Sequence, residues 1–206
     1  MCYIRAPEDL PIVQKDPNLK VYHGRSGLIL GCVGFDMEHP ILKDIRVRRA
    51  MAYALDRDLI AKEVVGELGE KACGWLSPGA YIGALTCSDL PQYPYDPEKA
   101  KKLLAEAGYP NGFKIKFYSY NFKPYKDLPP VLQAYWKEIG IDLEIELLGG
   151  PDFFAKAMNA ELPIFEDTFG TRPPEPSIFL YTLFHSSSSI VMKDSSTRQR
   201  SLYQTL

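Results

Sequence analysis

Long apolar runs are missing from this 206-residue sequence. No stretch approaches the roughly 20 consecutive apolar residues that an α-helix needs to cross a bilayer, so no transmembrane helix is expected. The first residues, MCYIRAPEDLPIV, also lack the basic and then apolar pattern of a secretory signal. We therefore expect either a protein that is cytosolic as it stands or a chain that lacks its natural N-terminus.

An excess of charge of either sign is absent as well. The chain has 24 Lys and Arg residues against 26 Asp and Glu residues, which gives a net charge of −2. The basic residues are scattered among acidic ones and form no stripe that could follow a phosphate backbone. The composition therefore argues against nucleic acid as a partner, and against an anionic membrane surface.

Metal-binding patterns are also missing. The four cysteines, at positions 2, 32, 73 and 87, form no CxxC pair, and the three histidines are isolated, so no metal is expected. Cys73 and Cys87 bracket a turn-rich loop. They could form a disulfide in an oxidising compartment or remain two partly buried thiols, and the sequence leaves both possibilities open. Cys32 lies in an apolar strand and is expected to pack in the core.

Sequence motifs of the common enzyme classes are not found. There is no GxSxG elbow, no GxxxxGK[ST] phosphate loop and no GxGxxG after a predicted strand. Glu144 and Glu146 share one face of a predicted strand, where acidic side chains are usually solvated. We expect no catalytic residue and no cofactor, which favours a binding protein over an enzyme.

The segment YPYDPEKAKKLLAEAGYPNGF, residues 93–113, has every local signal of a short helix. Asp96 is suited to cap its N-terminus, and Pro97 to occupy the first helical position. Gly108 supplies a left-handed stop. The apolar residues recur with helical spacing and define one buried face: Ala100, Leu103, Leu104 and Ala107.

The rest of the chain predicts an α/β fold. The apolar run LILGCVGFD (28–36) is typical of a strand buried on both faces, and helices capped by Asp44 and Asp56 follow it. Strands then alternate with helices through short links, which indicates a mostly parallel sheet with crossover helices. The predicted elements of this repeat are a strand at 113–120, a helix at 128–139, a strand at 141–148, a helix at 151–162 and a strand at 163–169.

Aromatic residues gather where the predicted strands end. In open α/β sheets, ligands bind at the carboxyl ends of the strands. The loops 119–127 and 170–176 follow two such ends and are rich in aromatic, proline and cationic residues. We therefore predict a binding wall there, although aromatic residues at strand ends also pack against their neighbours.

Several long segments resemble those of a known family. The segment IRVRRAMAYALDRDLIAKEVVGELGE (45–70), followed by residues 93–113, resembles the large peptide- and nickel-type solute-binding proteins of ABC transporters, extracellular solute-binding family 5. The later segments LQAYWKEIGIDLEIELL and PEPSIFLYTLF match family segments in the same order. The agreement covers roughly residues 7–185.

The resemblance implies one lobe of a bilobed periplasmic-binding-protein-like (class II) fold. Residues 1–206 would form a single α/β lobe, with 1–27 as an extended lead-in from a missing first lobe, including a short strand at 19–24, and 186–206 as a flexible Ser-rich end. The resemblance implies a periplasmic or extracellular importer component. It would act as a monomer, bind a peptide or other small polar solute, and deliver that solute to ABC permease subunits in the membrane.

The predicted ligand wall draws on both loops. Peptide-binding members of the family carry an Asp after the third strand that pairs with the peptide amino terminus, and Arg172 stands at the matching position here. A cation cannot hold an ammonium group, so Arg172 and Lys123 would instead favour a carboxylate or phosphate. Alternatively, Arg172 pairs with Glu166 or Glu175 at the surface. The predicted ligand-binding residues are Tyr120, Asn121, Lys123, Tyr125, Phe169, Thr171 and Arg172.

Two other classes of function compete with a solute-binding lobe. The first is an α/β enzyme domain that acts on a small polar substrate held by the same two loops. The second is an interaction module that docks a sensor or a permease through its outer helices. The sequence places no nucleophile–base pair near the two loops, and the resemblance favours the solute-binding lobe.

Overall fold

One mixed β-sheet organises the fold. The computed structural model describes residues 7–22, 28–74, 76, 81, 83–170, 177, 181 and 203–204, with side chains except at 28–31, 167–170 and 203–204. The strand order is β3-β2-β4-β1-β5, and only β1 of these five strands runs against the others. The predicted α/β class is therefore confirmed. The strands are β1 (Leu28–Phe35), β2 (Phe113–Tyr120), β3 (Ile141–Leu148), β4 (Ile164–Gly170) and β5 (Tyr203–Gln204).

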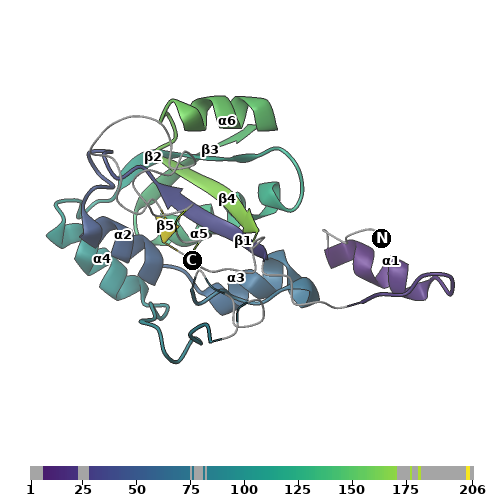
Figure 1. Ribbon diagram of the computed structural model, residues 1–206. Coiled ribbons are helices and arrows are strands. Elements are labelled where there is room, and N and C mark those ends of the chain that lie inside the picture. The colour runs from purple at the N-terminus through teal and green to yellow at the C-terminus, as the bar shows by residue number, and fades with distance from the viewer. Residues whose placement is uncertain are drawn as a thin grey trace.

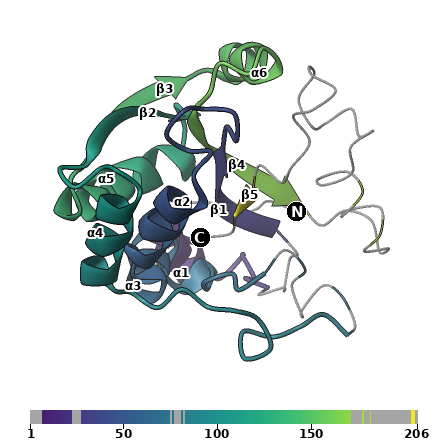
Figure 2. The same ribbon diagram turned by 90° about the vertical axis from the view of Figure 1, so that its left-hand side faces the viewer.

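Helices cover the two faces of the sheet unequally. Four helices lie against one face, and α6 (Gly150–Met158) lies on the other (Figures 1 and 2). The repeat β2-α5-β3-α6-β4 supplies the crossovers between the three parallel strands, as predicted. The helices of the first layer are α2 (Ile45–Tyr53), α3 (Arg57–Val64), α4 (Pro97–Glu106) and α5 (Leu128–Glu138).

The period-2 alternation of β2 divides the apolar side chains between two clusters. Ile115 and Phe117 face the four-helix layer, while Tyr118 and Tyr120 face α6. The buried indole of Trp136 lies at the centre of the larger cluster, 6.3 Å from the ring of Phe117. The sheet is therefore packed on both sides, as expected for parallel strands.

Aspartate caps start three helices where the sequence predicts them. The carboxylates of Asp44, Asp56 and Asp96 accept backbone N–H groups of the first turn at 2.8, 3.0 and 2.9 Å. Gly108 ends α4 with φ +95°, and Gly140 follows α5 with φ +88°. These boundaries depend on local chemistry, which is why the sequence alone located them.

The predicted helix at 151–162 is too long. Helix α6 ends at Met158, with Asn159 as its C-cap, and Ala160 then takes a positive φ of 55°. The chain turns there and enters β4 at Ile164. Leu162 is buried against the aromatic cluster from this turn, so its apolar side chain belongs to a loop and not to the end of the helix.

The extended lead-in predicted for residues 1–27 is wrong over its central part. Residues Pro7–Asp9 form a 3-10 turn, and Leu10–Lys15 form helix α1, which lies apart from the sheet (Figure 1). Pro11 occupies the first turn of α1, where its missing N–H leaves no bond unmade, and Leu10 is buried.

The structure describes only part of the two segments predicted at 19–24 and 186–206. Of the short strand predicted at 19–24, the four described residues are irregular, and the other two lie outside the described residues. The Ser-rich end at 186–206 also lies outside them, apart from β5. Among the described helices, none has the length and apolar character that crossing a bilayer demands. The structure contains two further 3-10 turns, Gly66–Leu68 (η2) and Tyr125–Asp127 (η3).

Candidate functional site

The three parallel strands end at one edge of the sheet, and the candidate site lies there. The central strand of the three, β2, pairs with β4 through Tyr118 and Phe165 and with β3 over its whole length. The backbone N–H of Asn121 donates to the carbonyl of Leu148 at 2.8 Å, which ties the loop after β2 to the end of β3. The ends of β2 and β4, which the loops of the predicted binding wall follow, therefore lie at the same edge.

An aromatic cluster occupies this edge. Tyr120, the last residue of β2, is only 6% exposed. Its ring centroid lies 4.2 Å from that of Phe153 in α6, 5.2 Å from Tyr125 and 5.4 Å from Phe122. Phe153 is itself buried and packs against Phe165 of β4 at 6.2 Å. The ring of Tyr120 is therefore held from three elements and forms the rigid base of the site.

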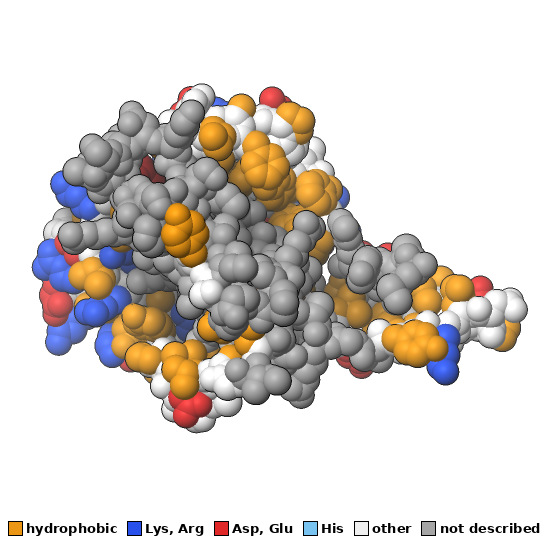
Figure 3. Space-filling model, in the orientation of Figure 1, with side chains coloured by type: hydrophobic (Ala, Val, Ile, Leu, Met, Phe, Trp, Pro, Cys, Tyr) orange, Lys and Arg blue, Asp and Glu red, His pale blue; other side chains and the backbone are white. Residues whose placement is uncertain are grey.

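Two rings of this cluster face the outside. Phe122 in the loop is 44% exposed, and Phe154 in α6 is 60% exposed. Their centroids lie 5.4 and 6.3 Å from that of Tyr120. Figure 3 shows hydrophobic side chains gathered between α6 and the loop after β2. The edge thus presents an apolar surface with a buried tyrosine behind it.

Lys123 does not present an uncompensated positive charge. Its ammonium group forms an ion pair with Glu8 and lies 3.7 Å from a carboxylate oxygen of Asp127. The hydrogen bond that the Lys123 ammonium donates to Glu8 raises the pKa of Lys123 and lowers the pKa of Glu8. Because two carboxylates surround this cation, it is poorly suited to hold an anionic ligand by itself.

Of the remaining predicted ligand residues, the structure describes the side chains of only Asn121 and Tyr125. Asn121 is exposed beside the aromatic cluster, and Tyr125 is half-buried within it. Phe169 lies in β4 opposite Ile29 of β1, and its side chain is outside the described set. Thr171 and Arg172 lie outside the described residues altogether, so their roles stay predictions.

Several residues of the cluster are not among the predicted ligand residues, notably Phe153, Phe154 and Leu76. Phe153 and Phe154 are adjacent in α6, and a helix that buries only one face leaves one of two such neighbours exposed. That adjacency was a usable signal. Leu76 also packs against the cluster, from the long loop between α3 and α4. No local pattern around Leu76 indicates this contact, because it depends on how the loop crosses the fold.

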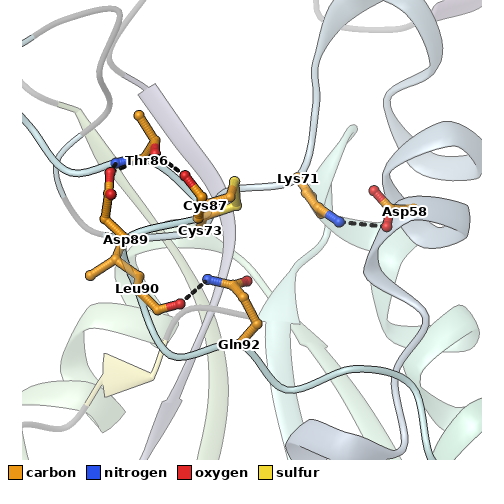
Figure 4. The surroundings of a disulfide bond; sticks show 9 residues. Asp58, Lys71, Cys73, Thr86, Cys87, Asp89, Leu90 and Gln92 are labelled. Carbon is orange, nitrogen blue, oxygen red and sulfur yellow. Dashed lines mark hydrogen bonds and ion pairs between the residues drawn. A yellow bond between two sulfur atoms is a disulfide. The ribbon is translucent and has the colours of Figure 1, made fainter.

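The loop that carries Leu76 is closed by a disulfide. Cys73 and Cys87 are bonded, with their Cα atoms 5.0 Å apart. Figure 4 shows the bond between two local contacts, the hydrogen bonds of Thr86 to Asp89 and the ion pair of Lys71 with Asp58. The disulfide therefore anchors both ends of a segment that reaches the aromatic cluster.

Replacing both Cys73 and Cys87 by serine is expected to lower the free energy of unfolding by about 2–4 kcal/mol, because the unfolded chain regains the entropy of an open loop. Urea denaturation would measure the change. Reductant should destabilise the parent protein by a similar amount and leave the double variant unaffected. Peptide mapping of oxidised, exported protein that finds two free thiols would contradict the bond.

A shallow hollow of about 480 Å³ lies away from this edge, over the first half of β2. Its charged side chains are exposed, and each forms an ion pair: Lys114 with Glu144 at 3.4 Å, Lys116 with Glu146 at 3.4 Å and Glu161 with Lys156 at 3.6 Å. Such surface pairs contribute little and offer no unsatisfied group to a ligand. The hollow is therefore a solvated face of the sheet. Residues around it include His39, Lys114, Lys116, Tyr118, Glu144 and Glu161.

Comparisons with known proteins agree with the architecture. Residues 1–190 match the family model of bacterial extracellular solute-binding proteins, family 5 middle region. The chain is 31% identical to heme-binding protein A of Haemophilus influenzae over 186 residues, and 28% identical to the dipeptide-binding protein of Escherichia coli over 188 residues. These matches cover 87% and 89% of this chain, but 33% and 34% of the relatives.

Solved structures share the same fold. The periplasmic binding protein DppA of Helicobacter pylori, in complex with the peptide STSA, superposes with a TM-score of 0.79 at 25% identity, covering 91% of this chain and 36% of DppA. HbpA2 of Haemophilus parasuis superposes with a TM-score of 0.74 at 29% identity, covering 87% and 36%. The chain thus spans about a third of the length of these proteins.

Proposed function

Because this chain belongs to family 5 of the bacterial extracellular solute-binding proteins, we propose that it forms one wall of a two-walled solute site in an ABC-type importer. The bound solute, a peptide or another small molecule, would be delivered to the permease subunits in the membrane. The observation that carries this proposal is the aromatic surface at the carboxyl edge of the parallel strands, around Tyr120.

The chemistry of the edge suits binding without catalysis. Around Tyr120, the described side chains are aromatic rings, an amide and a lysine paired with carboxylates. Such groups can orient a solute and remove water from it, and binding of this kind needs no covalent step. Two of the relatives carry heme and dipeptide in their names, and the solved DppA holds a peptide. These names support a small organic solute for this chain.

The compartment follows from the same family. Family members act in the periplasm or outside the cell, where disulfides persist, and Cys73–Cys87 is compatible with that environment. We propose that the mature protein acts there as a monomer. A second lobe would close over the aromatic wall, exclude water and supply the remaining contacts.

The proposal predicts that the solute binds much more tightly to a protein with both lobes than to this chain alone. A protein that carries both lobes should copurify with a small organic molecule, which mass spectrometry would identify. Calorimetry should show that this molecule binds the two-lobed protein at least about tenfold more tightly than the 206-residue chain, a difference of about 1.4 kcal/mol. Equal affinity would contradict the two-walled site, because closure would then add no contact.

A further inference from the structure

Two phenylalanine side chains at this edge, Phe122 and Phe154, are exposed. Helix α6 anchors itself with Phe153 and Ala157, both buried, so the fold needs no second phenylalanine on this helix. Yet Phe154 stands 60% exposed and Phe122 44% exposed, on two separate elements. Each exposed ring costs hydration free energy, which a bound apolar group would recover.

Both exposed rings are supported by the same buried residue, Tyr120. Each lies against Tyr120, and Phe122 also meets Tyr125 edge to face, with centroids 5.1 Å apart and planes at 74°. These contacts hold the two rings from behind while their outer sides stay open. Exposed rings that are held in this way suit offset or edge-to-face contact with an aromatic group of a ligand.

Among the described residues, the polar groups next to Phe122 in the chain do not favour an anionic solute. Lys123 is occupied by Glu8 and Asp127, and Asn121 is neutral. A solute carboxylate would have to compete with two protein carboxylates for this lysine, whereas an uncharged aromatic group meets no such competition. The negative faces of the phenylalanine rings likewise disfavour an anion.

We propose that Phe122 and Phe154 determine solute specificity by stacking with an aromatic or similarly flat apolar group of the ligand. Tyr120 backs this subsite, and Leu76, held in the disulfide loop, packs on the same cluster. The inference rests on the proposed function, since it describes the solute class of the same wall. It differs from the anionic ligand expected from Lys123 and Arg172, of which Arg172 lies outside the described residues.

Three dipeptides of equal length test the subsite on the full 206-residue chain: alanyl-tryptophan, alanyl-alanine and alanyl-glutamate. Saturation-transfer NMR titration detects weak binding to a single wall. We expect alanyl-tryptophan to bind at least about tenfold more tightly than alanyl-glutamate, the ratio expected from one stacked and desolvated ring. Phe154→Ser and Phe122→Ser should each remove most of this preference. Tyr22→Ser, which changes an aromatic side chain 76% exposed on the N-terminal segment, should leave it unchanged.

The outcomes separate this inference from the proposed function. Equal binding of the three dipeptides, unaffected by either phenylalanine variant, would overturn the stacking subsite and leave solute binding intact. Absence of binding to all three would also overturn it, while the copurified solute decides the proposed function independently. If Phe154→Ser instead abolishes self-association in size-exclusion chromatography, the rings form a contact between copies and the subsite is rejected. Thermal melts should show both variants folded, because both side chains are substantially exposed.

Discussion

Trp136→Ala is expected to lower the free energy of unfolding by about 3–5 kcal/mol, the range for truncating a buried aromatic residue to alanine. The indole is completely buried between α5 and β2, and it packs against Phe117. Its Nε1–H donates to the backbone carbonyl of Met51 at 3.0 Å, so the substitution also leaves a buried acceptor unpaired. Urea denaturation followed by circular dichroism would measure the loss.

Two further variants separate packing from hydrogen bonding. Trp136→Phe keeps most of the apolar volume and loses the bond to Met51, so about 1–3 kcal/mol of destabilisation is expected. Tyr22→Ala removes an exposed aromatic side chain and should change the free energy of unfolding by about 0.5 kcal/mol or less. If Trp136→Ala is as mild as Tyr22→Ala, the indole does not hold α5 against the sheet.

Gly112→Ala is expected to destabilise the protein by about 3 kcal/mol or more, because two costs combine. Gly112 has φ +72°, a conformation that alanine adopts only with strain. An added Cβ would also overlap the backbone carbonyl of Gly140, so the two turns that precede β2 and β3 would have to separate. Since these turns place two neighbouring parallel strands in register, the change should lower both stability and the yield of folded protein.

Gly108→Ala is the matched control for this prediction. Gly108 also has a positive φ, +95°, but a Cβ there would meet no described atom within 4 Å. It should therefore incur only the backbone strain, about 1–2 kcal/mol. Thermal denaturation of the two variants side by side measures the cost of the collision. Equal destabilisation would show that the turn at Gly112 relaxes freely.

Much of the fold was predictable because its signals are local. The caps at Asp44, Asp56 and Asp96 and the turn at Gly108 each act over a few residues, and β2 and β3 begin and end where their alternation does. The errors fall where a distant contact overrides the local pattern. Leu162 falls within the predicted helix 151–162, whereas it packs on the aromatic cluster from a turn.

The candidate site was likewise predictable only where its signals are local. The sequence indicated the carboxyl edge of the sheet and the aromatic loop after β2, because parallel strands joined by crossovers end at one edge. It could not show that Lys123 pairs with Glu8, since 115 residues separate the two in the chain. Nor could it place Leu76 on the ring cluster.

By itself, then, the sequence determined most helices and strands of the sheet and of the layer that covers it, where the caps and glycine stops lie, and which family the chain resembles. These properties depend on side-chain period and on hydrogen bonds within a few residues. Only the tertiary structure decided the charge and exposure of the site. The charge of Lys123 is compensated because the fold brings Glu8 next to it. Phe153 is buried and Phe154 exposed because the packing of α6 on the sheet sets which side chain water can reach.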